Sequence, residues 1–333
     1  MHRRAAAVIA RHRIWALLVG ILVVMAAIAP NFATTGNFAS ILRASATHLH
    51  AAVGLTLVMI AGHLDLSFGS GMSWAGMVAI GLQPRLGWSG AVAVALTSGA
   101  LLGLANGALV TRARVNSFIA TLGTLTVVQG MVNIASKGGT LAVQDYAAGD
   151  WLEGALLGIL CPRVVLCLLV AAAAALLGRT RPGRNLLLVG ANPTTAWYAG
   201  IGTAGYVTAA FALSGVLAAA GGALFAMSVS SANPLMGESS LMVVIAAVII
   251  GGTSMQGGRG SVVQTVVAVV ALVSLTNGLS CMGARPETQL LASGFVLGAS
   301  VLYDALLVRA VAARKGRRPE LMLDDWPGKE GTR

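Results

Sequence analysis

The chain has 333 residues, of which 56% are hydrophobic and 10% are charged, and its net charge is +11. A soluble globular chain carries about a quarter charged residues, so this composition excludes an ordinary soluble domain and favours a multi-span membrane protein. The basic residues lie mainly in short loops and at the two termini, where lipid headgroups rather than nucleic acid are their expected partners.

Hydropathy predicts an all-α transmembrane bundle of about ten spans, some of them broken or re-entrant. The first span follows a basic N-terminus and is interpreted as uncleaved, because Pro30 would stand directly after the cleavage site of a signal peptide. The spans are expected at residues 14–30, 45–62, 67–82, 89–110, 115–136, 162–178, 205–228, 240–254, 261–279 and 288–309. We expect residues 1–310 to form one transmembrane domain and residues 311–333 a cytoplasmic tail.

The distribution of lysine and arginine sets the expected orientation. With the N-terminus inside, 17 of the 22 basic residues fall in cytoplasmic segments, and ten spans then place both termini in the cytoplasm. Asn106-Gly107 and Asn277-Gly278 end the fourth and ninth spans. This weak internal repeat would fit two five-helix halves, as in many transporters.

A polar motif, AGHLDLSFGSG, occupies residues 61–71. Asp65 would be expensive in hydrocarbon, and an acid at membrane depth indicates a functional site by default. One interpretation places Asp65 and Ser67 in a re-entrant turn beside a transport path; the other makes Asp65 a cap for the following helix. His63 has no second ligand at a metal spacing, and the three cysteines form no CxxC pair, so neither a metal site nor a disulfide is expected.

A second polar motif, TRARVNSFIATLGT, occupies residues 111–124. Asn116 can cap the next helix, and Thr121 and Thr124 fall on one face of it with Phe118. This face either lines a pore or hydrogen-bonds a neighbouring helix. The candidates for a translocation path are therefore Asp65, Ser67, Asn116, Phe118, Thr121 and Thr124.

Residues 184–215 form the longest partly polar segment between two apolar runs. Arg179, Arg181 and Arg184 stand at its start, which places it on the cytoplasmic side. We therefore predict that it is a docking surface for a cytoplasmic partner.

The remaining motifs do not indicate an enzyme. Residues 250–264 are rich in glycine, but no phosphate-binding G-x-x-x-x-G-K-[ST] occurs in the chain, so a tight cytoplasmic turn is expected there. The chain also lacks HExxH and GxSxG, and no plausible Ser/His/Asp site can be assembled. No catalytic residue is predicted.

Four segments, taken together and in this order, give the chain a resemblance to a known family. They are AGHLDLSFGS (61–70), GLANGALVTRARVNSFIATLGT (103–124), GRNLLLVGANPTTAWYAGI (183–201) and VVIAAVIIGGTSMQGGRGSV (243–262). The chain resembles the inner-membrane permeases of bacterial ABC importers of the ribose/xylose/arabinose/galactoside type, over about residues 40–310.

The resemblance implies a set of partners and a role for the loop near residue 190. The partners are a second permease copy or homologue, two cytoplasmic ATP-binding cassettes and a periplasmic sugar-binding protein. ATP and Mg²⁺ would bind the cassettes, and this chain would bind no cofactor. The segment that docks into the ATPase corresponds to Gly190, Ala191, Asn192, Thr195, Ala196, Ala199, Gly200 and Ile201.

Two alternatives to a monosaccharide importer stay open at this point. A secondary transporter working alone would need an embedded site for ion coupling, for which Asp65 is the main candidate. An ABC importer permease could instead serve a nucleoside, an autoinducer or an amino acid.

Overall fold

The computed structural model describes residues 2–154, 161–285, 287–296, 298–299 and 302, with side chains from residue 14 onward. The predicted tail at 311–333 and residues 303–309 of the predicted tenth span lie outside the described residues. Residues 287–296 are helical. The other elements, in chain order, are α1 (His2–Ile28), α2 (Thr35–Ile60), α3 (Phe68–Thr111), α4 (Ser117–Ser136), β1 (Leu141–Ala142), α5 (Ala147–Glu153), α6 (Pro162–Leu177), α7 (Arg181–Ala191), α8 (Pro193–Tyr198), α9 (Thr203–Ser228), β2 (Ser231–Ala232), α10 (Met236–Ile250) and α11 (Val262–Cys281).

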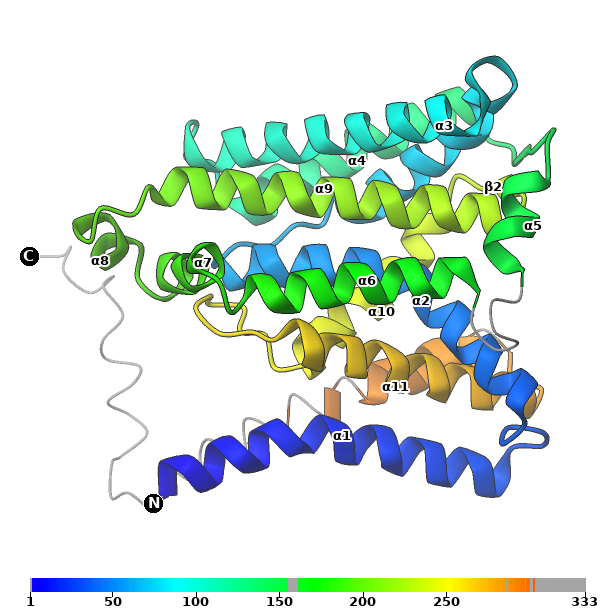
Figure 1. Cartoon of the computed structure of the whole chain (residues 1–333), viewed down its shortest axis with the longest axis horizontal. Coiled ribbons are helices and arrows are strands. Elements are labelled where there is room, and N and C mark those ends of the chain that lie inside the picture. The colour runs from blue at the N-terminus through cyan, green and yellow to red at the C-terminus, as the bar shows by residue number, and fades with distance from the viewer. Residues whose placement is uncertain (1, 155–160, 286, 297, 300–301, 303–333) are drawn as a thin grey trace, which may run out of the picture.

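The long helices lie side by side as a bundle, with α3 and α4 along one edge and α1 along the other (Figure 1). Helix α2 runs through the middle, where it packs against α6, α9, α10 and α11. Its central residues, including Val53, Leu55 and Val58, are fully buried. The core of the bundle is therefore built around α2.

Five described helices are long and apolar enough to cross a membrane, and the bent pair α6 and α7, which meet at 71°, makes up to six. This supports a helical membrane bundle, while the count of ten spans stays a prediction. Helix α3 accounts for two of the predicted spans, because the chain reverses at Gly87, whose backbone is non-helical. Asn106 then lies against Ser67, so the two halves of α3 run antiparallel.

Small residues allow α3 and α9 to pack at very short range. Gly99, Gly103 and Gly107 recur every four residues along α3 and face α9. A Cβ atom on Gly103 would lie 2.2 Å from the backbone oxygen of Phe211, and one on Gly215 would lie 2.1 Å from that of Gly99. Close backbone approach of this kind is how helices associate in lipid, where apolar burial alone provides no driving force.

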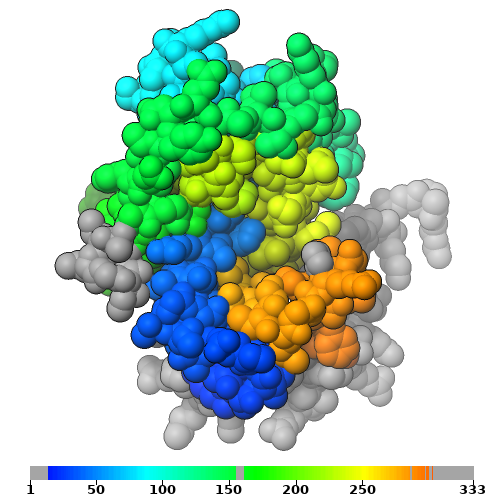
Figure 2. Space-filling view, turned by 90° about the vertical axis from the view of Figure 1, so that its right-hand side faces the viewer, coloured from blue at the N-terminus to red at the C-terminus, as the bar shows by residue number. Residues whose placement is uncertain are grey.

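The two ends of the bundle differ in their loops. The end with α7 and α8 holds the predicted cytoplasmic arginines of residues 179–184, and α1 begins at the same end (Figure 1). At the opposite end, shown face-on in Figure 2, β1 and β2 pair antiparallel beside α5. The purely helical prediction did not include this two-residue ladder, since strands this short leave no periodic pattern in a sequence. We call these the α8 end and the β end.

Candidate functional site

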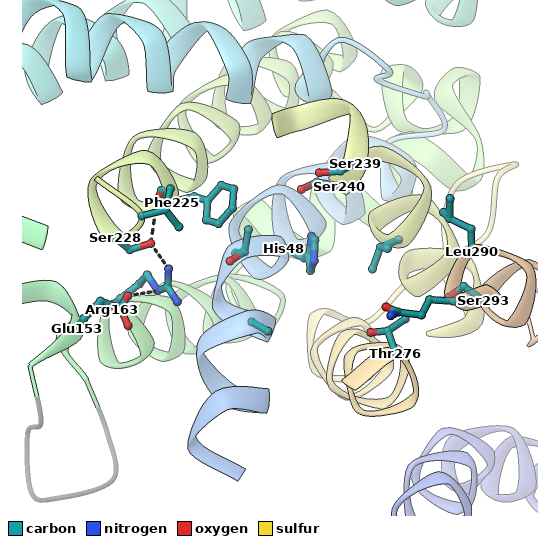
Figure 3. Close-up of a pocket in the computed structure, with 15 residues that line it drawn as sticks. His48, Glu153, Arg163, Phe225, Ser228, Ser239, Ser240, Thr276, Leu290 and Ser293 are labelled. Atoms are coloured by element: carbon teal, nitrogen blue, oxygen red, sulfur yellow. Dashed lines mark hydrogen bonds and ion pairs between the residues drawn. The ribbon is translucent and has the colours of Figure 1, made fainter. Parts of the chain in front are cut away.

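A cavity of about 690 Å³ opens near the β end of the bundle. Six segments that are distant in sequence surround it, namely α2, α5, α6, α9, α10 and α11, together with residues 289–293 (Figure 3). The lining residues are Ala44, Thr47, His48, Glu153, Arg163, Phe225, Ser228, Val229, Ser239, Ser240, Val243, Thr276, Gln289, Leu290 and Ser293. Its volume falls within the range of small-molecule sites, roughly 300–1,000 Å³.

An ion pair forms one wall of this cavity. The Nε atom of Arg163 lies 3.2 Å from a carboxylate oxygen of Glu153, and Arg43 lies 3.6 Å from the other oxygen. Arg163 also donates hydrogen bonds to the backbone oxygen of Arg43, at 3.0 Å, and to Ser228 Oγ (Figure 3). Glu153 and Arg163 are the two charged residues that line the cavity, and Arg43 beside them gives the cluster two cationic side chains for one carboxylate.

The opposite wall carries polar atoms without partners. Ser240 is 1% exposed, lines the cavity, and its Oγ makes no hydrogen bond in the protein. The Nδ1 atom of His48 is likewise buried and unpartnered. Both side chains stand between α2 and α10 at the edge of the open space (Figure 3). Buried polar groups are normally hydrogen-bonded, so these two atoms are exceptions. Each has less than 1 Å² of accessible surface and is therefore closed to the cavity.

Asp65 lies elsewhere, at the centre of a hydrogen-bond network that joins the start of α3, Asn106 near its end, the first half of α4 and the middle of α9. Its carboxylate accepts from Ser67 N at 2.9 Å, from Ser67 Oγ at 2.6 Å and from Ser214 Oγ at 2.8 Å. Asn106 continues the network by donating to Ser67 Oγ at 2.8 Å and accepting from Thr124 Oγ1 at 2.6 Å. The network joins both halves of α3 to α4 and α9, and Asp65 does not line the cavity.

The six predicted path residues divide into two groups. Asp65, Ser67 and Thr124 share the network just described. Thr121 is buried beside it, where its hydroxyl donates to the backbone oxygens of Ser117, at 2.8 Å, and Leu64, at 3.3 Å. Asn116 and Phe118 lie at the exposed start of α4, where Asn116 Oδ1 caps the helix by accepting from Phe118 N at 2.9 Å. The role of all six residues in a translocation path stays a prediction.

The predicted docking segment forms an exposed helical turn. Asn192 caps α8 by accepting from Thr195 N at 2.9 Å, and Ala196 anchors the turn as its buried residue. Trp197 and Tyr198 point outward, 64% and 78% exposed, with their rings in edge contact at 5.1 Å between centroids. Two large aromatic side chains on a short turn are typical of the buried centre of a protein interface.

A junction of backbone atoms joins this turn to α2. Gly190, at the end of α7, lies so close to Ile60 that a Cβ atom would come within 1.8 Å of the Ile60 oxygen. The same oxygen accepts a hydrogen bond of 2.9 Å from Gly258 N. Gly257, with a positive φ of 84°, fits against Gly62 and Gly190, where a Cβ would lie 2.6 Å from each. We call Ile60, Gly62, Gly190, Gly257 and Gly258 the glycine junction.

Residues 37–301 match the family described as branched-chain amino acid transport system / permease component. The chain belongs to this family. The permease is 33% identical over 291 residues to the ribose import permease protein RbsC of Bacillus subtilis, covering 85% of this chain and 89% of that protein. It is 32% identical over 296 residues to the ribose import permease protein RbsC of Escherichia coli K12, covering 87% and 91%. It is 32% identical over 309 residues to the L-arabinose transport system permease protein AraH of the same organism, covering 88% and 91%.

No solved structure matches the permease. The family and the apolar helices together make it a multi-pass protein of the bacterial inner membrane. Its relatives are transport subunits by name rather than enzymes. The resemblance noted from the four sequence segments is therefore confirmed at the level of a sugar ABC importer permease.

Sequence reasoning missed the cavity residues and the two aromatics of α8. Arg163 could have been identified from the sequence, because a charged residue stands in the first turn of an otherwise apolar predicted span. Ser240 and His48 could not, since a single serine or histidine in an apolar helix is common.

Proposed function

We propose that this permease is the transmembrane subunit of an ATP-driven importer for a monosaccharide such as ribose or arabinose. The observation that carries the proposal is the similarity to ribose and arabinose permeases, which extends over more than four fifths of the chain. The proposed partners are a second permease copy or homologue, two ATP-binding cassettes and a periplasmic sugar-binding protein. ATP and Mg²⁺ bind the cassettes, and the permease performs no chemistry.

In this proposal α8 docks onto a cassette through Trp197 and Tyr198. Movement of the cassettes on ATP binding displaces α8, and the displacement reaches α2 through the glycine junction, because Asn192 alone separates α7 from α8. Backbone atoms in direct contact have no side chains between them to absorb the movement. The bundle then alternates between two states that differ in access for the sugar.

The test is whether a cassette subunit encoded with this permease co-purifies with it in mild detergent. Wild-type protein is expected to retain the cassette, and the double variant Trp197→Ala/Tyr198→Ala is expected to lose it while keeping its thermal stability, since both side chains are exposed. Trp151→Ala is the matched control, because Trp151 is also an exposed aromatic, at 62%, but lies on α5 at the β end.

Retention of the cassette by the double variant would contradict docking through α8. Uptake by the wild-type chain without any cassette, driven by a proton or sodium gradient, would contradict the importer itself and favour a secondary transporter.

A further inference from the structure

We propose that a second cavity, at the α8 end, binds one anionic phospholipid, with an acyl chain inside the cavity and the phosphate against the arginines of the turn between α6 and α7. The cavity has a volume of about 150 Å³ and lies between α2, α6, α7 and the start of α11 (Figure 1). Its walls include Leu57, Ala174, Leu177, Leu186 and Val262. We call it the α7 cavity.

The lining of the α7 cavity fits a hydrocarbon chain. Among the described residues that line it, only Ser261 has a polar side chain, and its hydroxyl already accepts a hydrogen bond from Gln264 N as the cap of α11. The other lining residues are leucine, isoleucine, valine, alanine and glycine. Such a space offers no partner to a polar solute, whereas the CH₂ groups of an acyl chain are stabilised there.

The α7 cavity lies where the bundle passes from hydrocarbon to headgroups. Leu176 and Leu188, which are chain neighbours of lining residues, are exposed, and so is Val263, which itself lines the cavity. Helix α7 bends away from α6 by 71° and so runs across the end of the bundle. Helices that lie in a membrane interface combine a basic face with an apolar face in this way.

Three exposed arginines border this apolar region. Gly178 and Gly183 line the α7 cavity, and they are the chain neighbours of Arg179 and Arg184, with Arg181 between them. Neither of the ion pairs among the described residues includes these arginines. Guanidinium groups bind phosphate through parallel N–H donors, and basic pockets between spans on the cytoplasmic side are typical sites for anionic headgroups. A phospholipid with an anionic headgroup matches both the arginines and the apolar cavity.

The acidic end of the chain is the other candidate occupant, because Glu320, Asp324 and Asp325 stand there beside apolar residues. The order of charges argues against it. Residues 314–318 carry four basic side chains directly before these acids, and the arginines at the α7 cavity would repel them. A membrane surface with anionic lipids carries no such cations of its own.

The test measures lipid binding to the full permease in detergent by native mass spectrometry. The probes are palmitoyl-oleoyl phosphatidylglycerol and the phosphatidylcholine with the same acyl chains. Wild-type permease should bind the anionic lipid more tightly, and Arg179→Gln/Arg181→Gln should weaken this binding by about 10- to 30-fold. Arg184 stays unchanged, because its guanidinium donates a hydrogen bond to the Arg179 backbone oxygen and holds the turn.

The matched control for charge is Arg112→Gln/Arg114→Gln. These arginines are also exposed, and they follow Thr111, whose hydroxyl contacts Thr208 near the start of α9, so they belong to the same end of the bundle. Neither of them lines the α7 cavity. This double variant removes the same charge and should leave the preference for the anionic lipid unchanged.

A second pair of variants tests the acyl chain. Ala174→Phe places a ring in the α7 cavity and should weaken binding of the anionic lipid, whereas Ala172→Phe places the same ring on an exposed position of α6 and should not. Thermal unfolding without lipid establishes that both variants are folded. The arginine variants alter exposed side chains, so they test the site even where Ala174→Phe does not fold.

Four results would overturn the inference. They are equal affinity of the wild type for the two lipids, equal losses in the two arginine double variants, undiminished binding to folded Ala174→Phe, and displacement of the lipid by glycerol phosphate, which would indicate a soluble phosphate as the ligand. Binding that appears only after deletion of residues 311–333 would assign the α7 cavity to the tail instead. The inference goes beyond the proposed function and is tested without cassettes, so either can fail alone.

Discussion

Two regions of α2, its C-terminal end and its middle, are packed in opposite ways. At Ile60 the backbone is held by glycines of α7 and of the loop after α10, with no space for a single methyl group. At His48, twelve residues earlier and about 18 Å along the helix at 1.5 Å per residue, the same helix borders a cavity with unpartnered polar atoms. The first region is packed backbone against backbone, and the second has open space beside the helix.

This difference predicts opposite responses to substitution in the two regions. The glycine junction forms only because its glycines carry no side chains, so these positions tolerate little substitution. Side chains that border a cavity have room to change without displacing the backbone. The predictions below test this contrast, beginning with the largest expected effect.

Gly190→Ala should damage the glycine junction most. The new Cβ would lie 1.8 Å from the Ile60 oxygen, which is backbone and cannot move aside. We expect a loss of at least about 3 kcal/mol in stability, beyond the usual range for overpacking, together with loss of uptake. Thermal unfolding and membrane yield measure the first effect, and transport assays measure the second.

The control is Gly205→Ala at the start of α9, where no atom lies within 4 Å of the added Cβ. It should be neutral or slightly stabilising, because alanine favours the helix over glycine. Wild-type stability in Gly190→Ala would show that the junction is looser than the distances indicate.

Asp65→Ala should have the next largest effect, because it removes the acceptor for both serines; the Ser214 hydroxyl is then unpartnered, and the Ser67 hydroxyl keeps only the hydrogen bond from Asn106. We expect a loss of about 2–4 kcal/mol, measured by thermal unfolding of the purified permease. If Asp65 serves only to hold the network, uptake per folded molecule should survive. Loss of uptake at unchanged stability would instead support the place of Asp65 in the translocation path.

The two arginines that contact Glu153 should differ from each other. Arg163 is 6% exposed and donates hydrogen bonds to Ser228 and to the Arg43 backbone oxygen in α2, so Arg163→Met should cost about 1–3 kcal/mol. The Arg43 side chain is 38% exposed, and Arg43→Met should cost no more than about 0.5 kcal/mol, as for a surface ion pair. Equal losses in parallel unfolding experiments would mean that Arg43 is a full member of the cavity wall.

Hydropathy and charge predicted the helical bundle, and the polar loop after Arg184 predicted the exposed turn at α8. The halves of α3 were also predicted as separate spans, at 67–82 and 89–110, and the structure places the reversal between them at Gly87. The cavity could not be predicted, since its residues range from Ala44 to Ser293 and only the packing of α2 against α9, α10 and α11 brings them together. The glycine junction could not be predicted from the sequence either, because Gly62, Gly190 and Gly257 belong to three segments that are distant in sequence and meet only in the folded chain.

The central claim is that this permease moves its substrate only when cassettes dock at α8. The most direct measurement is uptake of radiolabelled D-ribose into proteoliposomes that contain the permease, its cassette subunit and its binding protein, with ATP supplied on the cassette side. We predict uptake that requires ATP and is lost in Trp197→Ala/Tyr198→Ala. Uptake that proceeds without ATP, or that is unchanged in this double variant, would contradict the account.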